Sequence, residues 1–250
     1  GTEVHDYMRI ALDRMYNALN APDEDDVILN GCATEGNNTV IKSVYFSEIL
    51  NKKKNHVITS EVEHPSITNT FEFLESLGVE VTYLPVDSQG IVTPEILSRY
   101  IRPDETALVS IMWANNEIGN VYPVEKIARI AHKRGALFHT DAVQATGKIP
   151  INLKNSKIDM LSISEQKKKA PKGVGEQYVR KNVRFKPFLI GGHQELGRRA
   201  GTENVASIVA LGKACELAEK YIEYENTKVR ELRDYLETKI LKNIPKTKIN

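Results

Sequence analysis

Two stretches, HTDAVQATGKIP at residues 139–150 and DMLSISEQKKKAPKGVG at residues 159–175, decide the fold. The first follows the apolar run Ala-Leu-Phe, which is typical of a buried strand, and places Asp141 just after that run. The second begins with another short apolar run and places Lys167 a few residues beyond it. The pattern therefore predicts two strands, each followed at its carboxyl end by a charged side chain.

Strand and helix patterns alternate along the chain up to residue 175. We expect strands near residues 27–29, 57–59, 79–84, 107–112, 136–140 and 159–163, and helices near 4–19, 34–49, 67–77, 93–101 and 124–133. This alternation predicts an α/β fold with a mostly parallel sheet and helices on both faces. Beyond it, residues 177–179 are expected to pair antiparallel, and a long helix over 205–241 is expected to break near Tyr224.

Polar residues follow five of the predicted strands, at the edge where ligands bind in parallel sheets. They are Ala33-Thr34, His64, Asn116, Asp141–Gln144 and Ser164–Lys167. Asp141 and Lys167 suit pyridoxal phosphate (PLP), because the cofactor needs an amine for a Schiff base and a carboxylate to keep its pyridine nitrogen protonated. On these two residues alone, an ion pair or a solvated lysine is the simpler interpretation. The five strand ends together favour the cofactor site.

The other candidate residues each have a structural alternative. Residues 31–34 precede a helix and could bind phosphate through backbone N–H groups, or the threonine could cap that helix. His64 could stack on a flat ring and move a proton, or be structural. Asn116 and Gln144 could donate to a phenolic oxygen, or cap loops. The basic loop at 198–202 could contact a phosphate, including that of a neighbouring subunit, or be an exposed loop.

Composition excludes several classes of function. The 250 residues are 41% hydrophobic and 27% charged with a net charge of +1, which gives no reason to expect nucleic acid or a membrane as partner. Cys32 and Cys215 are too far apart for a metal site or a disulfide framework, so we expect a reduced, cytoplasmic protein without a metal. No signal peptide and no run of 18 apolar residues is found, which disfavours secretion and membrane spanning. The absence of G-x-G-x-x-G and P-loop motifs disfavours dinucleotide enzymes and NTPases.

Six segments spread along the chain carry a resemblance that covers essentially all of it. They are CATEGNN (32–38), EHPSI (63–67), MWANNEIG (112–119), HTDAVQATGKIP (139–150), APKGVG (170–175) and GRRAGTENVASIVALGKACELA (197–218). In order and spacing they resemble the cysteine desulfurases of the NifS branch of the class V aminotransferase family. The resemblance implies the large domain of a fold-type I, aspartate-aminotransferase-like PLP enzyme, usually a homodimer.

The resemblance also implies roles for individual residues. Lys167 matches the Schiff-base lysine, Asp141 the partner of the pyridine nitrogen, and His64 the histidine that stacks on the ring and transfers protons. The remaining implied cofactor contacts are Ala33, Thr34, Asn116, Gln144, Ser164, Gln166 and, from the other subunit, Thr202. The family removes sulfur from L-cysteine, giving alanine and a persulfide for iron–sulfur cluster assembly. L-cysteine and an iron–sulfur scaffold protein are therefore the implied partners.

The resemblance further predicts a PLP-binding large domain at 1–222 and the start of a C-terminal small domain at 223–250. The chain opens inside a helical pattern and ends without a cap, so we expect a part of a longer protein, truncated at both ends. The family's catalytic cysteine lies downstream of these residues, so this segment is not expected to complete sulfur transfer. A cofactor-free scaffold on the same fold, or another class V enzyme such as a selenocysteine lyase, remains as the alternative.

Three places depart from the family pattern: the run at 165–169, Glu176 in place of a small residue, and Leu196 in place of an arginine. Because these changes bring charge or an apolar side chain to segments that line the cofactor and dimer contact in the family, we expect them to lie in exposed loops.

Overall fold

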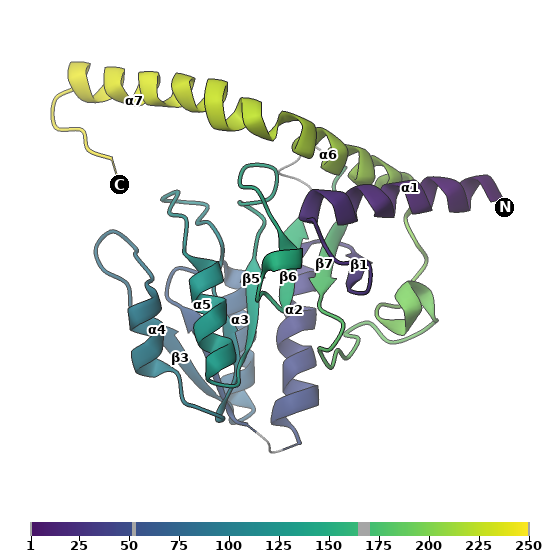
Figure 1. The fold of residues 1–250 in the computed structure, drawn as a ribbon. Coiled ribbons are helices and arrows are strands. Elements are labelled where there is room, and N and C mark those ends of the chain that lie inside the picture. Colours follow the sequence, from purple (N-terminus) through teal and green to yellow (C-terminus); the bar gives the residue numbers. More distant parts are fainter. Residues whose placement is uncertain (1, 52–53, 165–170, 250) are drawn as a thin grey trace.

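A seven-stranded sheet forms the centre of the protein in the computed structural model, which describes residues 2–51, 54–164 and 171–249 (Figure 1). The strands are β1 (Asp26–Asn30), β2 (His56–Ser60), β3 (Glu80–Leu84), β4 (Thr106–Ser110), β5 (Leu137–Asp141), β6 (Met160–Ser164) and β7 (Gly175–Val179), in the order β1-β7-β6-β5-β4-β2-β3. Strands β3, β2, β4, β5 and β6 run parallel, and β7 is antiparallel to both β6 and β1. The predicted α/β fold with a mostly parallel sheet is confirmed.

Helices cover both faces of this sheet. They are α1 (Thr2–Leu19), α2 (Ala33–Val44), α3 (Pro65–Ser76), α4 (Pro94–Tyr100), α5 (Val124–Lys133) and α6 (Val205–Tyr224); a further helix, α7 (Arg230–Asn243), follows α6 in the chain. Val57 and Leu108 pack in one core with side chains of α2 and α3. Their neighbours Ile58 and Val109 pack in a second core with α1, α4, α5 and α6. Since successive side chains of a strand point to opposite faces, the two cores mark the two layers.

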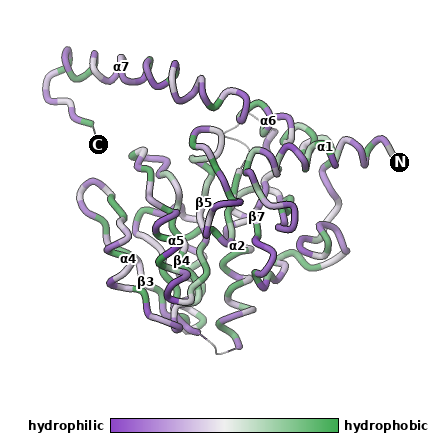
Figure 2. The backbone as a smooth tube through the Cα atoms, viewed as in Figure 1, coloured by the Kyte–Doolittle hydropathy of each residue, from purple (hydrophilic) through white to green (hydrophobic). Residues whose placement is uncertain are grey.

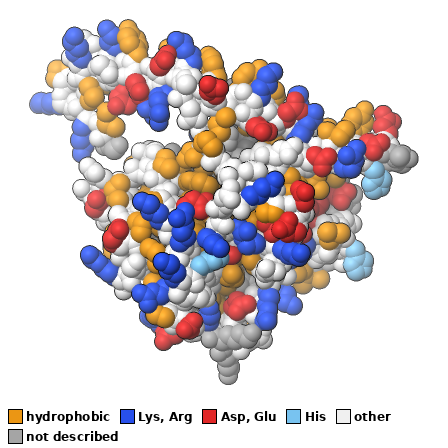
Figure 3. Space-filling view, viewed as in Figure 1, with side chains coloured by type: hydrophobic (Ala, Val, Ile, Leu, Met, Phe, Trp, Pro, Cys, Tyr) orange, Lys and Arg blue, Asp and Glu red, His pale blue; other side chains and the backbone are white. Residues whose placement is uncertain are grey.

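The predicted long helix near the end of the chain consists of α6 and α7. They are joined by a π-helical segment, Glu225–Val229, so the expected break near Tyr224 is a local widening through which the helix continues. Helix α7 has no buried residues, and it extends away from the body of the protein (Figures 1 and 3). Its sequence mixes hydrophilic and hydrophobic residues (Figure 2), and Leu232 and Leu236 are 58% and 60% exposed. Helix α7 therefore adds little to either core.

The expectation that the departures lie in exposed loops is correct for Leu196 and wrong for Glu176. Leu196 is 91% exposed and has a φ of 53° in a short 3-10 segment. Glu176 is the second residue of β7, which lies between β1 and β6, and it is completely buried. The Cys215 thiol on α6 lies 4.0 Å from a Glu176 carboxylate oxygen. Residues 165–169 lie outside the described residues.

Among the helices that the structure describes, none combines the length and apolar character that crossing a bilayer requires.

Candidate active site

A cavity of about 450 Å³ lies where β4, β5 and β6 end and α2 and α3 begin. Seven of the ten predicted site residues line it: Ala33, Thr34, His64, Asn116, Asp141, Gln144 and Ser164. Parallel strands end at the same edge of a sheet, which explains how residues from distant parts of the chain meet there. Gln166 and Lys167 lie outside the described residues. Thr202 lines a different cavity of about 110 Å³, together with Glu195 and Arg199.

Asp141 is the buried charged group of the cavity. It is only 6% exposed; its Oδ2 accepts a hydrogen bond from Asn37 Nδ2 at 2.9 Å, and its Oδ1 accepts one from the Val143 backbone N–H at 3.0 Å. Burial raises the pKa of Asp141, and the hydrogen bonds from Asn37 and Val143 oppose that rise only in part. A buried carboxylate with neutral donors alone is stabilised by a cation, and a pyridinium N–H supplies one.

His64 both caps a helix and lines the cavity. It is the N-cap residue of α3, where Pro65 follows at the first position, and its Nδ1 accepts a hydrogen bond from the Ser66 backbone N–H at 3.1 Å. Ser66 Oγ lies 2.8 Å from the same ring nitrogen. The structural role considered for this histidine is therefore present, and it leaves the ring exposed at the cavity wall. The two interpretations are compatible.

The amino end of α2 has the geometry of an anion site. Its N-cap residue is Cys32, which has extended backbone and makes no side-chain capping bond, so Thr34 does not cap the helix. The backbone N–H groups of the first turn and the helix dipole therefore favour an anion beside Ala33 and Thr34. Glu35 in the same turn does not line the cavity: its Oε2 accepts from the Gly31 backbone N–H at 2.8 Å, and Arg199 Nε donates to its Oε1 at 2.8 Å.

The basic loop at 198–202 uses its arginines structurally. Arg199 pairs with Glu35, and Arg198 lies 2.6 Å from an Asp26 carboxylate oxygen. The hydrogen bond to Glu35 raises the pKa of Arg199. Within the described structure, the Arg198 pair connects the loop to β1, and the Arg199 pair connects it to α2.

Asn115 and Asn116 are neighbours with different roles: one caps the loop, and the other lines the cavity. Asn115 is buried, donates to the Val62 carbonyl at 3.0 Å, and accepts from the Glu117 and Ile118 backbone N–H groups at 2.8 and 2.9 Å. Asn116 is exposed and lines the cavity. Loop capping therefore belongs to Asn115, which leaves the amide of Asn116 available to a ligand.

Two further residues of the site were missed from sequence. Asn37 is completely buried and contacts Asp141, and Ser66 contacts both Asn37 and His64. The spacing from Ala33 to Asn37 places both on one face of a helix, which was the available signal for Asn37. No comparable signal marks Ser66, because a serine two residues after a helix start is ordinary.

Glu63 anchors the segment that carries His64. Its carboxylate accepts from Ser60 Oγ at 2.7 Å and from the Met112 backbone N–H at 2.9 and 3.0 Å, which ties the end of β2 to the end of β4. Burial raises the pKa of Glu63 to about 8; the bonds from Met112 and Ser60 lower it, and the charge of Asp141 raises it further.

Replacing Glu63 with glutamine is expected to remove part of the pH dependence of stability. The raised pKa means that the stabilising contribution is complete below the ordinary glutamate pKa and is lost as pH rises towards about 8. Unfolding of the native protein should cost of the order of 2 kcal/mol less near pH 7 than near pH 5 through this group. Urea titrations at both pH values measure it, with exposed Glu61→Gln as control. If the free energy of unfolding changed by the same amount between the two pH values in the native protein and in Glu63→Gln, the raised pKa of Glu63 would be contradicted.

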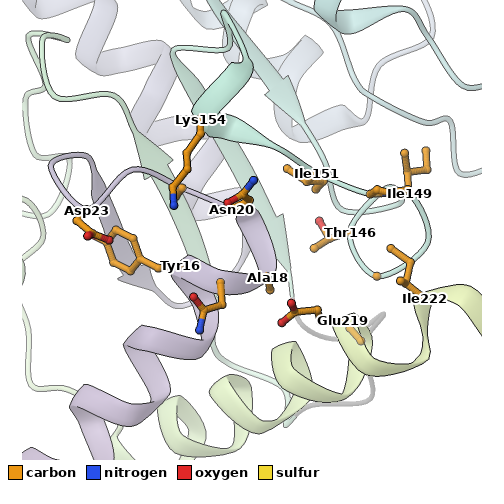
Figure 4. Close-up of a pocket in the computed structure, with 15 residues that line it drawn as sticks. Tyr16, Ala18, Asn20, Asp23, Thr146, Ile149, Ile151, Lys154, Glu219 and Ile222 are labelled. Carbon is orange, nitrogen blue, oxygen red and sulfur yellow. The ribbon is translucent and has the colours of Figure 1, made fainter.

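A second cavity, of about 410 Å³, lies apart from these residues (Figure 4). Glu219 and Ile222 of α6 face the segment after β5, represented by Thr146 and Ile149, with Asn20 at the end of α1 nearby. None of the predicted site residues lines it.

Comparison with known proteins identifies a family for the chain. The family described as Aminotransferase class-V matches residues 1–250. A cysteine desulfurase of Nostoc sp. is 50% identical over 233 residues, covering 93% of this chain and 57% of the relative. The cysteine desulfurase NifS of Azotobacter vinelandii is 46% identical over 245 residues, covering 98% of this chain and 60% of the relative. A solved structure titled as a NifS-like protein superposes with a TM-score of 0.91 at 38% identity, covering 97% of this chain and 66% of that one.

The chain thus spans about 57–60% of the length of these two curated relatives. The match of the whole chain to one family, together with the similarity in fold to a solved structure, establishes the lineage: the protein belongs to the class-V aminotransferase family.

Proposed function

We propose that the protein is a PLP-dependent cysteine desulfurase, which removes sulfur from L-cysteine and gives alanine and a persulfide for iron–sulfur cluster assembly. The observation that carries the proposal is the cavity in which a desolvated Asp141, an exposed His64 and the uncapped amino end of α2 come together. The similarity to proteins named cysteine desulfurase supports L-cysteine as the substrate.

The cavity offers a partner for each part of the cofactor. Asp141 would hold the pyridine nitrogen, and the backbone of Ala33 and Thr34, with Ser164, would hold the phosphate. Asn116 and Gln144 present amide groups for a phenolic oxygen. PLP supplies an electron sink for the charge left when a substrate gives up its α-proton.

The remaining predicted residues act at the edges of this arrangement. His64 would lie against the ring face and move protons. Lys167 would bind PLP covalently and Gln166 would contact its phosphate; both belong to the proposal and not to the described structure.

A second subunit would complete the site. Thr202 does not line the cavity that holds Asp141, and its proposed contact is to the phosphate bound by another copy. Ile190 and Leu196, which flank the same loop, are 88% and 91% exposed, as expected of a surface that a partner covers. We also propose residues 1–222 as the cofactor domain and 223–250 as the start of a second domain, since α7 is without buried residues. A cytoplasmic location and an iron–sulfur scaffold as sulfur acceptor complete the proposal.

Addition of PLP tests the function directly. The native protein is expected to develop the visible absorption band of lysine-bound PLP, and Lys167→Ala should lose it. Lys172→Ala is the matched control, because Lys172 is an exposed lysine five positions further along the sequence and should keep the band.

Two results would contradict the proposal. No band in the native protein would favour a cofactor-free scaffold on the same fold. A band that survives Lys167→Ala would assign the covalent link to another lysine. Assays of the full-length protein separate a desulfurase from a selenocysteine lyase. A desulfurase should release alanine from L-cysteine, whereas a selenocysteine lyase should release alanine only from L-selenocysteine.

A further inference from the structure

Four side chains from separate elements form one hydrogen-bonded chain beside the cavity. Asn37 Nδ2, on α2, donates to Asp141 Oδ2 at the end of β5 and also to Ser66 Oγ on α3, both at 2.9 Å. Ser66 Oγ lies 2.8 Å from His64 Nδ1. Asp141 and His64, which have no hydrogen bond to each other among the described contacts, are thus linked through two neutral side chains.

Asp141 determines which groups donate and which accept in this series of hydrogen bonds. A carboxylate only accepts hydrogen bonds, so it turns the N–H side of the Asn37 amide towards itself. The cost is visible at the other end of the amide: Asn37 Oδ1 is buried and has no hydrogen-bond partner among the described residues. Rotating the amide would bring that oxygen against the carboxylate, so the unpaired oxygen is the more stable arrangement.

Ser66 is the residue that connects Asn37 to His64 by hydrogen bonds. Its oxygen accepts from Asn37, which occupies one of its two lone pairs and favours the hydroxyl hydrogen pointing to the nitrogen of the imidazole ring. The Ser66 backbone N–H, which can only donate, points at the same nitrogen at 3.1 Å. The backbone N–H requires His64 Nδ1 to be an acceptor, and the hydroxyl can then contact the same nitrogen only as a donor. The proton of the neutral ring is therefore on Nε2.

We propose that Asn37 and Ser66 are positioning residues that hold neutral His64 in the Nε2–H tautomer and couple it to Asp141. The catalytic meaning rests on the proposed function: Nε2 is then the ring nitrogen that presents a proton to a molecule in the cavity. The tautomer itself is a property of these four residues and is present without the cofactor.

Nitrogen NMR on the ¹⁵N-histidine-labelled protein reads the tautomer directly. Long-range ¹H–¹⁵N correlations near pH 8.5, about two units above the ordinary histidine pKa, distinguish a protonated from an accepting ring nitrogen. His64→Gln identifies the signal of His64 among the six histidines. We expect a protonated Nε2 and an accepting Nδ1. A protonated Nδ1 in the native protein overturns the proposal.

Three substitutions test the coupling. Ser66→Ala removes the hydroxyl donor, and Asn37→Leu frees the serine oxygen to accept from the ring. Each should lower the ratio of Nε2–H to Nδ1–H about fivefold, the equivalent of one neutral hydrogen bond. Asp141→Asn removes the carboxylate that orients Asn37. The amide can then rotate, and its oxygen takes the serine hydrogen away from His64. The ratio should fall although no hydrogen bond joins Asp141 to the ring among the described contacts.

Matched controls lie next to both positioning residues. Thr68→Ala deletes a hydroxyl from the same turn of α3, and Asn38→Leu replaces the exposed-side neighbour of Asn37, whose amide bonds to the Thr34 carbonyl. Both should keep the native ratio. An unchanged ratio in Ser66→Ala and Asn37→Leu, with native circular dichroism, would refute the coupling. Because no measurement uses PLP, failure of cofactor binding would refute the proposed function and leave this result standing.

Discussion

Asparagine in place of Asp141 is expected to raise the melting temperature of the cofactor-free protein and to weaken PLP binding about 150- to 5,000-fold. The two effects have one cause. Burial raises the pKa of Asp141, so the ionised carboxylate opposes folding when no cation faces it. When a pyridinium is bound, the same charge becomes half of a buried pair, whose loss costs about 3–5 kcal/mol.

The sign of the stability effect can be followed with pH. A carboxyl whose pKa is raised on folding contributes stability that is present at acidic pH and is lost as pH rises through the folded value. The native protein should therefore lose stability with rising pH relative to Asp141→Asn, and the two should converge in acid. Calorimetry over the acidic to neutral range and a PLP titration at neutral pH measure both effects.

Asp13→Asn is the control for this pair of measurements. It removes the same charge from an exposed position on α1, where the side chain is 61% exposed, and should alter neither quantity. Lower stability of cofactor-free Asp141→Asn at neutral pH would contradict the account of Asp141 as an uncompensated buried charge.

Alanine in place of Gly212 should destabilise the protein by about 1–3 kcal/mol and lower its melting temperature by several degrees. Helix α6 crosses α1 at this glycine. A Cβ there would lie 2.5 Å from Ala11 Cα and 2.9 Å from the Ala11 carbonyl oxygen. Backbone atoms cannot turn away as a side chain can, so the two helices would have to separate. The loss of packing exceeds the ~1 kcal/mol that alanine gains over glycine within a helix.

Thermal unfolding followed by circular dichroism checks this prediction. Lys213→Ala, one residue further along α6 with a side chain 52% exposed, should change the midpoint little. A Gly212→Ala variant with the melting temperature of the native protein would contradict the close packing of α1 against α6 at this glycine.

Regular elements were largely predictable from the residues because their cause is local. The residues of α5 were predicted as Val124 to Lys133, as observed, since apolar side chains recur there at helical spacing. Thr93 was predicted as the cap of α4, and its hydroxyl accepts from the Ile96 backbone N–H at 3.2 Å. The approach of Gly212 to Ala11 was not predictable, because two helices far apart in sequence must be packed before a missing Cβ has a consequence.

The candidate site was likewise predictable only in part. The residue types and their places after apolar runs were enough to predict that Asp141, His64, Asn116 and Ser164 meet at one edge of a parallel sheet, because strand direction determines that edge. The buried state of Asp141, the link through Asn37 and Ser66, and the burial of Glu176 depended on which side chains come within hydrogen-bonding distance after folding. The sequence by itself determined the lineage and the kind of site. Only the tertiary structure decided which groups lose water and which donors replace it, since desolvation and hydrogen bonding are set by neighbours in space.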